Sequence, residues 1–484
     1  MAARNAVTGI TLGVMLLMAC GGGTSPSPNG SLTITGAEQS DTVSAFLPTP
    51  LTVRVLTSGK PVLGATVSLS TIPDAMTRLG VLYLDLLSGA ALNYAQGQTD
   101  AAGRFATNLR FGGAAGRAGV IVTVTNPDFT DTVYFNVLPG RPAMVTGLSL
   151  DTALQVGRST TLPTSGVTDR YNNPRTDPVS YQTLSASVSL NGATLTALSI
   201  DRARVLVRAG TYLDTVRISV VPVAELAAGG TQVSFFQSDY TSYRRVPNTG
   251  GFVEWVPDGS EVLSDGVNVS GSWLGSLKAT RPDGSTRPSF PPPPGVLSIW
   301  IPRYARDGSE LYFTAVTGVA HDVHFRVWRM RVDGSRTEPV PGIPEAETTM
   351  AAPSPDGKRL AYVALIGSGQ IRMLDLEHGV PIPFSVSGHS PRWSPTGALI
   401  GFVTPDDGDK LKVMAPDGSS IRTVSEPGGR YDLGFDWSPD GQWIVAKEMF
   451  RQRVTLINVV TGLVLPLPVK LDAILGPVWR PAQP

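Results

Sequence analysis

The heptapeptide Phe435-Asp-Trp-Ser-Pro-Asp-Gly441 decides the fold, because imperfect copies of it recur through the second half of the chain. Its aromatic residue suits a half-buried strand position, and its proline fixes φ at the first corner of a turn. The aspartate can bond to its own backbone, and the glycine supplies the positive φ with which the chain reverses. The motif therefore predicts a strand that ends in a tight turn. The other copies are Val253–Gly259, Pro302–Gly308, Ala351–Gly357, Pro391–Gly397 and, in truncated form, Pro477–Pro481.

The spacing of the copies is typical of β-propeller blades. After Gly441 comes a run rich in β-branched and aromatic residues, Gln442–Ala446, which predicts a second strand. A third strand over Val454–Asn458 then enters another turn at Thr461-Gly462. Earlier copies repeat this order, and the glycine of the motif recurs after 40 to 49 residues. That period is in the range of four-stranded propeller blades.

The two ends of this half complete each other. The segment Pro477–Pro481 supplies an opening strand with no second strand after it, whereas Gly229–Phe236 supplies a turn and a second strand with no opening strand before it. Pairing them closes a ring of six blades and removes open sheet edges. The pattern resembles the TolB-like six-bladed β-propeller, whose blades carry a signature like Trp437–Gly441, and the resemblance covers residues 223–484. Departures that reduce the blade symmetry are Thr396 for Asp, Pro353 for Trp, and Tyr304-Ala-Arg306.

Composition limits the classes of partner. The chain has 484 residues, of which 42% are hydrophobic and 16% charged, and the formal net charge is zero. Several compact domains are expected at this length. A neutral chain carries no electrostatic footprint for nucleic acid or for an anionic membrane surface, so no nucleic-acid partner is predicted. The single cysteine excludes an intramolecular disulfide.

That cysteine, Cys20, follows a short export signal. Arg4 precedes an apolar run over Val7–Met18, and Leu17–Cys20 resembles the lipobox of bacterial lipoproteins. A plain secretory peptide or a membrane anchor is the alternative, but the run is too short to span a bilayer core of ~30 Å. The resemblance implies a signal peptide over residues 1–19, lipid on the Cys20 sulfur, and a flexible tether over residues 20–30. We therefore expect an exported, lipid-anchored envelope protein, at the outer membrane in a diderm bacterium.

Two β-sandwiches are predicted between the tether and the propeller. In residues 31–139, alternating runs such as Leu51–Leu56 and turns such as that at Asp100 resemble bacterial immunoglobulin-like modules. Residues 141–222, with strands such as Asp214–Val220, resemble the group-2 bacterial immunoglobulin-like repeat. The chain is thus predicted to be all-β: two Ig-like β-sandwiches followed by a six-bladed β-propeller, residues 223–484, that the C-terminal strand closes.

Candidates for catalysis or metal binding are few, since the chain has four histidines and no Gly-x-Ser-x-Gly elbow. His321 and His324 could share a metal on a helical turn, but on a strand they would face opposite sides. The carboxylates of Asp406, Asp407 and Asp409 could hold calcium, yet they lack the spacing of a known loop. We predict no catalytic residue, no metal and no cofactor, and enzymatic activity is left open.

Ligand binding is predicted in segments outside the repeat, where aromatic and arginine side chains favoured in binding surfaces gather. The candidates are Tyr240, Tyr243, Arg244, Arg245 and Trp273. Ordinary variation of surface loops is the alternative interpretation.

The sequence thus predicts a lipid-anchored, non-catalytic binding protein whose propeller recognises an envelope protein or glycan. Two alternatives stay open: a propeller enzyme acting on polysaccharide or peptide, and an adhesin that binds through its Ig-like domains.

Overall fold

A computed structural model describes residues 30–72, 81–82, 94–237, 240, 242–247, 249–265, 276–319, 322–333, 335–470 and 475–481. Regular structure in these residues is β-strand, apart from one 3-10 turn at Pro405–Asp407, so the all-β prediction is confirmed. Within the same residues, no helix is long and apolar enough to cross a membrane. Cys20 and the predicted signal peptide and most of the predicted tether lie outside the described residues.

The chain divides into two compact units. The first contains residues up to 146 together with 165–178 and 209–212; the second contains 147–164, 179–208 and 213–484.

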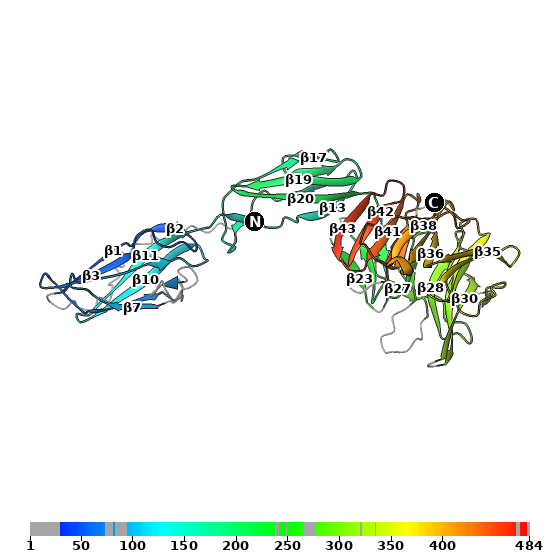
Figure 1. The fold of residues 1–484 in the computed structure, drawn as a ribbon, viewed down its shortest axis with the longest axis horizontal. Helices are drawn as coiled ribbons and strands as arrows, with labels where there is room; N and C mark the ends of the chain where they lie inside the picture. The colour runs from blue at the N-terminus through cyan, green and yellow to red at the C-terminus, as the bar shows by residue number, and fades with distance from the viewer. Residues whose placement is uncertain are drawn as a thin grey trace, which may run out of the picture. The chain divides into compact units, whose positions relative to one another are not determined.

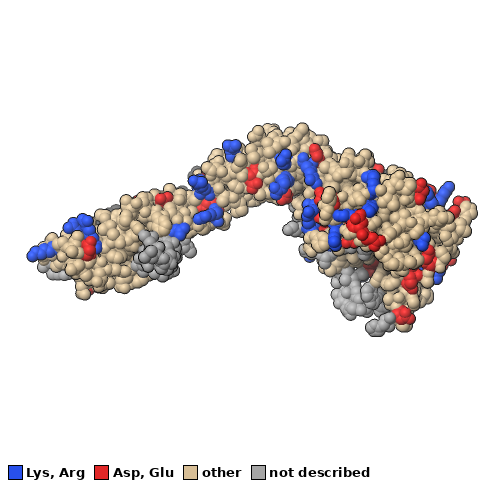
Figure 2. All heavy atoms as spheres, in the orientation of Figure 1, with Lys and Arg blue, Asp and Glu red and all other residues tan. Residues whose placement is uncertain are grey.

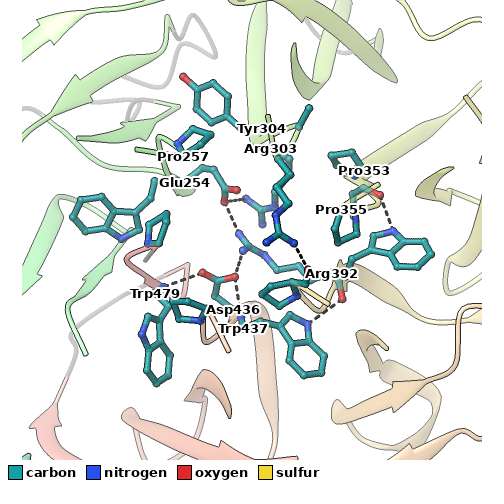
Figure 3. Close-up of a pocket in the computed structure, with 18 residues that line it drawn as sticks. Glu254, Pro257, Arg303, Tyr304, Pro353, Pro355, Arg392, Asp436, Trp437 and Trp479 are labelled. Atoms are coloured by element: carbon teal, nitrogen blue, oxygen red, sulfur yellow. Dashed lines mark hydrogen bonds and ion pairs between the residues drawn. The ribbon is translucent and has the colours of Figure 1, made fainter. Parts of the chain in front are cut away.

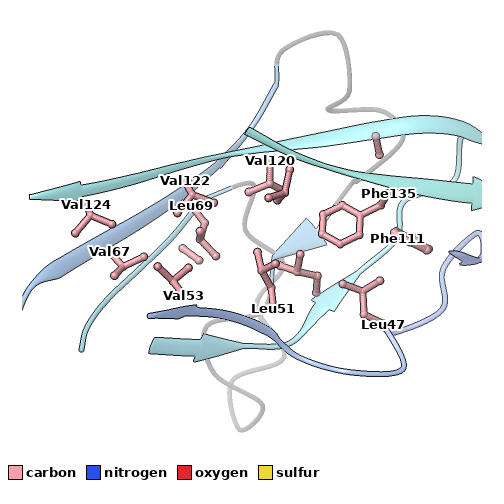
Figure 4. Close-up of a cluster of buried hydrophobic side chains, with 14 of the residues drawn as sticks. Leu47, Leu51, Val53, Val67, Leu69, Phe111, Val120, Val122, Val124 and Phe135 are labelled. Carbon is pink, nitrogen blue, oxygen red and sulfur yellow. The ribbon is translucent and has the colours of Figure 1, made fainter. Parts of the chain in front are cut away.

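Two sheets make up most of the first unit. One joins β1 (Gly30–Thr35), β3 (Leu51–Thr57), β4 (Lys60–Pro61) and β8 (Arg104–Thr107). The other has the order β2-β11-β10-β5-β7, with bounds Ser40–Thr42, Phe129–Leu138, Gly116–Thr125, Thr66–Thr71 and Tyr94–Gln98. Alternate residues of β3 and β5 point inward, since successive strand side chains face opposite sides. Figure 4 shows them meeting in one core: Leu51 and Val53 from the first sheet face Val67, Leu69 and Val120 from the second.

The second unit begins with two smaller sheets. One has the order β13-β20-β19-β16, with bounds Asp151–Gln155, Tyr212–Val221, Asp201–Ala209 and Val179–Thr183. The other has the order β14-β18-β17, with bounds Ser159–Thr161, Thr194–Ala197 and Val188–Asn191.

Six four-stranded antiparallel sheets follow in the described part of the chain, and Figure 1 colours them from green to red. The first has the order β23-β22-β21-β44, with bounds Tyr243–Val246, Val233–Phe236, Leu226–Ala228 and Pro477–Trp479. The others run in chain order: β24–β27 (Val253–Trp255, Val262–Ser264, Lys278–Thr280, Thr286–Pro288), β28–β31 (Ser298–Tyr304, Glu310–Val319, Asp322–Arg331, Thr337–Pro339), β32–β35 (Thr348–Pro353, Arg359–Ala364, Gln370–Asp375, Val380–Ser387), β36–β39 (His389–Trp393, Ile400–Thr404, Lys410–Met414, Arg422–Thr423) and β40–β43 (Tyr431–Trp437, Trp443–Glu448, Arg453–Asn458, Val464–Lys470).

The first of these sheets joins strands from distant parts of the sequence. Strand β44 pairs antiparallel with β21, so that Leu226 lies opposite Trp479 and Ala228 opposite Pro477. The C-terminal strand therefore occupies the place that an opening strand fills in the other five sheets.

The repeated motif forms the turn that its residues predict. In the last copy Gly441 has φ of 69° and donates its N–H to the Ser438 carbonyl at 2.8 Å. Asp440 accepts the backbone N–H of Gln442 at 3.0 Å. The aromatic residue binds the neighbouring sheet, because Trp437 donates Nε1–H to the Arg392 carbonyl at 3.1 Å. The turn thus ends one strand while the indole fixes the distance to the next sheet.

Candidate functional site

The residues predicted to bind ligand do not form one site. Tyr240 is fully buried, and its hydroxyl accepts a hydrogen bond from Gln155 Nε2 and donates one to the Ala224 carbonyl, both at 2.9 Å. Burial raises the pKa of Tyr240 to about 12. The prediction that Tyr240 contacts ligand is wrong for this structure, because no part of its side chain reaches the surface.

The other described candidates lie on β23, the edge strand of its sheet furthest from β44. Tyr243 is half-buried and accepts a hydrogen bond from Arg245 Nη2 at 2.6 Å, while Arg244 donates to the Pro282 carbonyl at 3.3 Å. Trp273 lies outside the described residues. The β23 side chains remain candidates for an edge contact, separate from the cavity that follows.

The side chains considered as metal ligands contact different partners. Asp406 accepts from Ser387 at 2.6 Å, and Asp407 pairs with Lys412 at 2.8 Å, so these carboxylates do not converge on one point. His324 contacts Glu347 through Nδ1 at 2.6 Å, which helps to raise the pKa of the imidazole. His321 lies outside the described residues.

The strongest candidate site is a cavity of about 340 Å³ lined by the inner-edge strands β24, β28, β32, β36, β40 and β44 and the turns that follow them (Figure 3). Such a volume is in the range of small-ligand sites. The proline of the motif lines the cavity in five copies: Pro257, Pro355, Pro395, Pro439 and Pro481. In the remaining copy Arg306 takes the place of this proline.

Of the five charged side chains that line the cavity, four come one residue before the aromatic position of the motif: Glu254, Arg303, Arg392 and Asp436. Neighbouring residues of a strand point to opposite sides. The motif indole therefore packs between sheets while the preceding side chain points into the cavity.

Arg392 joins the two carboxylates across the cavity. Its Nη2 donates to Glu254 Oε2 on β24 at 2.7 Å, and its Nη1 donates to Asp436 Oδ1 on β40. Asp436 Oδ2 in turn accepts the backbone N–H of Trp479 on β44 at 2.9 Å. This network links four of the six sheets through β36, β24, β40 and β44 (Figure 3).

Arg303 is bound less completely than Arg392. Among the described residues, its hydrogen bonds to Glu254 at 3.2 Å and to the Pro302 carbonyl at 2.8 Å both come from Nη1. Burial, and then the positive charge of Arg392, lower the pKa of Arg303 to about 10. Burial also disfavours the Arg392 cation, but Asp436 and Glu254 outweigh it and raise that pKa. The pKa of Asp436 is raised, mainly by burial, which Arg392 only partly opposes.

The cavity residues were missed in the sequence although a signal for them exists. The position before the motif aromatic is charged in four copies, next to an aromatic residue at a strand position suited to burial. Figure 2 shows acidic and basic side chains interspersed over the face in view.

Comparisons with known proteins are limited to structures, since no protein-family model and no curated protein matches the chain. TolB from Acinetobacter baumannii is 14% identical, with a TM-score of 0.42, over 63% of this chain and 83% of that one. A putative TolB from Agrobacterium tumefaciens is 17% identical, with a TM-score of 0.40, over 50% of this chain and 87% of that one. A chain of a nidogen/laminin complex is 8% identical, with a TM-score of 0.41, over 53% of this chain and 98% of that one. Because these TM-scores are all below 0.5, the propeller interpretation depends on the strand pairing within the six sheets.

Proposed function

We propose that this chain is a non-catalytic binding protein of the bacterial cell envelope, anchored by lipid on Cys20. Its six four-stranded sheets form a closed six-bladed propeller that recognises a protein ligand through the central cavity. The sandwiches before it are Ig-like modules that hold the propeller away from the anchor. The observation that carries this proposal is the convergence of all six inner-edge strands on one polar cavity.

The chemistry of the cavity favours binding over catalysis. Both of its carboxylates are paired with Arg392, so they form part of a fixed charge network. Paired, partly buried charges of this kind position a ligand and select among ligands rather than react with them. Five rigid proline rings at the mouth add contact surface that loses little conformational entropy when a ligand binds.

The test is a cross-linked capture from solubilised envelopes with the full chain, comparing wild type with Pro439→Trp. Proline is favoured at the first corner of this type of turn, but most other residues are tolerated there, so an indole can be placed at the cavity mouth without a change of fold. Pro282→Trp is the matched control, because Pro282 starts an exposed Pro-Asp-Gly turn outside the cavity lining.

A partner that wild type and Pro282→Trp capture, and that Pro439→Trp loses, supports recognition through the cavity. Equal capture by all three proteins would contradict it and would move recognition to the sandwiches. Loss by Pro282→Trp alone would also contradict it and would move recognition to the β23 edge, because Arg244 contacts the Pro282 carbonyl.

A further inference from the structure

We infer that the cavity binds the carboxylate of an acidic peptide segment between Arg303 and Arg306, an inference that rests on the proposed function and names its ligand class. Both arginines belong to the copy of the motif that departs most from the repeat, on and just after β28. Five donors in a planar fork make a guanidinium well suited to carboxylate.

The charges in the cavity leave a net positive centre. The lining contains three arginines and two acids. Arg392 lies between both acids, and Arg303 shares Glu254 with it. Arg306 is exposed at the mouth, and its hydrogen bond among the described residues goes to the Pro395 carbonyl, which is neutral. One positive charge at the mouth is therefore not matched by a carboxylate of the lining.

The donors of Arg303 support the same site. Its described hydrogen bonds use Nη1 alone, so Nε and Nη2 can serve a ligand that enters the cavity. The positive charge of Arg392 acts on Arg303 and helps to lower its pKa, so an anion placed beside Arg303 relieves that repulsion.

A peptide fits the walls better than a sugar does. Sugar sites commonly offer the open face of an aromatic ring. The indoles that line this cavity are buried between sheets, with exposed fractions of 4 to 8% for Trp255, Trp393, Trp437 and Trp479. Tyr304, the other aromatic ring of the lining, is half-buried. The proline rings instead form a small apolar mouth, which suits a short extended segment with one acidic side chain. The cavity of about 340 Å³ holds only a few residues.

The experiment titrates tetraglutamate, tetraglutamine and tetralysine into the full chain and follows tryptophan emission, with calorimetry as a second readout. All eight tryptophans lie at or after position 255, so emission reports on the propeller half of the chain. We expect saturable binding of tetraglutamate alone, weakened by added salt because exposed charge pairs are screened.

Single substitutions test which side chains bind tetraglutamate. Arg303→Gln should weaken tetraglutamate binding about tenfold or more, as expected for loss of a charged hydrogen bond, and the more exposed Arg306→Gln about threefold. Glu254→Gln should tighten binding, since it removes a carboxylate that competes for Arg303. Arg326→Gln, an exposed arginine of β30 outside the cavity lining, is the matched control and should bind as wild type does.

Failure of this inference can be told from failure of the proposed function. Absence of tetraglutamate binding, equal binding of tetralysine, or no effect of both Arg303→Gln and Arg306→Gln would overturn the carboxylate site. If Pro439→Trp still loses the captured partner in that case, the cavity remains the recognition site for a ligand of another class.

Discussion

Replacing Arg392 with methionine tests whether the charge network in the cavity supports the propeller. The change keeps an unbranched apolar stem but removes the cation between Glu254 and Asp436, whose side chains are 16% and 15% exposed. Removing one partner of a buried ion pair costs roughly 3–5 kcal/mol. Arg303 still lies 3.2 Å from Glu254, and Asp436 keeps the backbone N–H of Trp479 at 2.9 Å. We therefore expect a loss near the lower end, about 3 kcal/mol.

Urea unfolding followed by tryptophan emission measures this loss, because every tryptophan lies in the propeller half. With a slope of about 3 kcal/mol per molar urea, the midpoint should fall by about 1 M. Arg326→Met is the control, since an exposed arginine without a buried counter-ion should change stability by less than about 0.5 kcal/mol.

The stability lost in Arg392→Met should depend on pH. Without Arg392 the buried Asp436 carboxylate has a pKa raised still further, so the folded state binds a proton more readily than the unfolded state does. The loss should therefore shrink as the pH falls from about 8 to about 5, and Asp436→Asn added to Arg392→Met should restore part of the stability. A loss below about 1 kcal/mol at the higher pH, or a double variant no more stable than Arg392→Met, would refute the reasoning.

Two further predictions concern single side chains. Asp265 is buried, and burial is the main cause that raises its pKa to about 7. The stability of the fold should therefore decrease as the pH rises from about 4 to about 7. Asp265→Asn should flatten this part of the plot of thermal-unfolding temperature against pH, and an unchanged slope would contradict the role given to Asp265. Thr396 accepts the Ala398 N–H at 3.4 Å, whereas Asp440 accepts the Gln442 N–H at 3.0 Å in the equivalent turn. Thr396→Asp should therefore increase the free energy of unfolding by about 0.5–1 kcal/mol, measured as a higher urea midpoint. A lower midpoint would show that the turn does not accommodate the carboxylate.

The strands and turns of the propeller could be predicted because they depend on residues that are near in sequence. The turn at Ser438–Gly441 is built from its own hydroxyl, carboxylate and positive-φ glycine, and each of these is visible in the motif. The pairing of β21 with β44 could also be predicted, since each end of the repeat lacks what the other supplies.

The position of Tyr240 could not be predicted in the same way. Its burial depends on Gln155, a residue of β13 that precedes it by 85 positions and lies in a different sheet. Two tyrosines and two arginines in a segment outside the repeat have the composition of a binding surface. Composition alone does not reveal which of them a distant strand covers.

The cavity residues were not recognised in the sequence because, unlike Tyr240, they belong to the repeat. A repeat makes similar sheets, and identical sheets around a cavity would present equal side chains to it. Recognition of one asymmetric ligand requires that the copies differ where they face the cavity. The two positions that differ in charge are the one before the aromatic residue, as at Glu254 and Arg392, and the proline that Arg306 replaces. Arg306, a departure that weakens the repeat as a pattern, and Arg303, at the variable position before the aromatic residue, are the residues to which we assign binding. The turns and indoles that keep the pattern hold the sheets together.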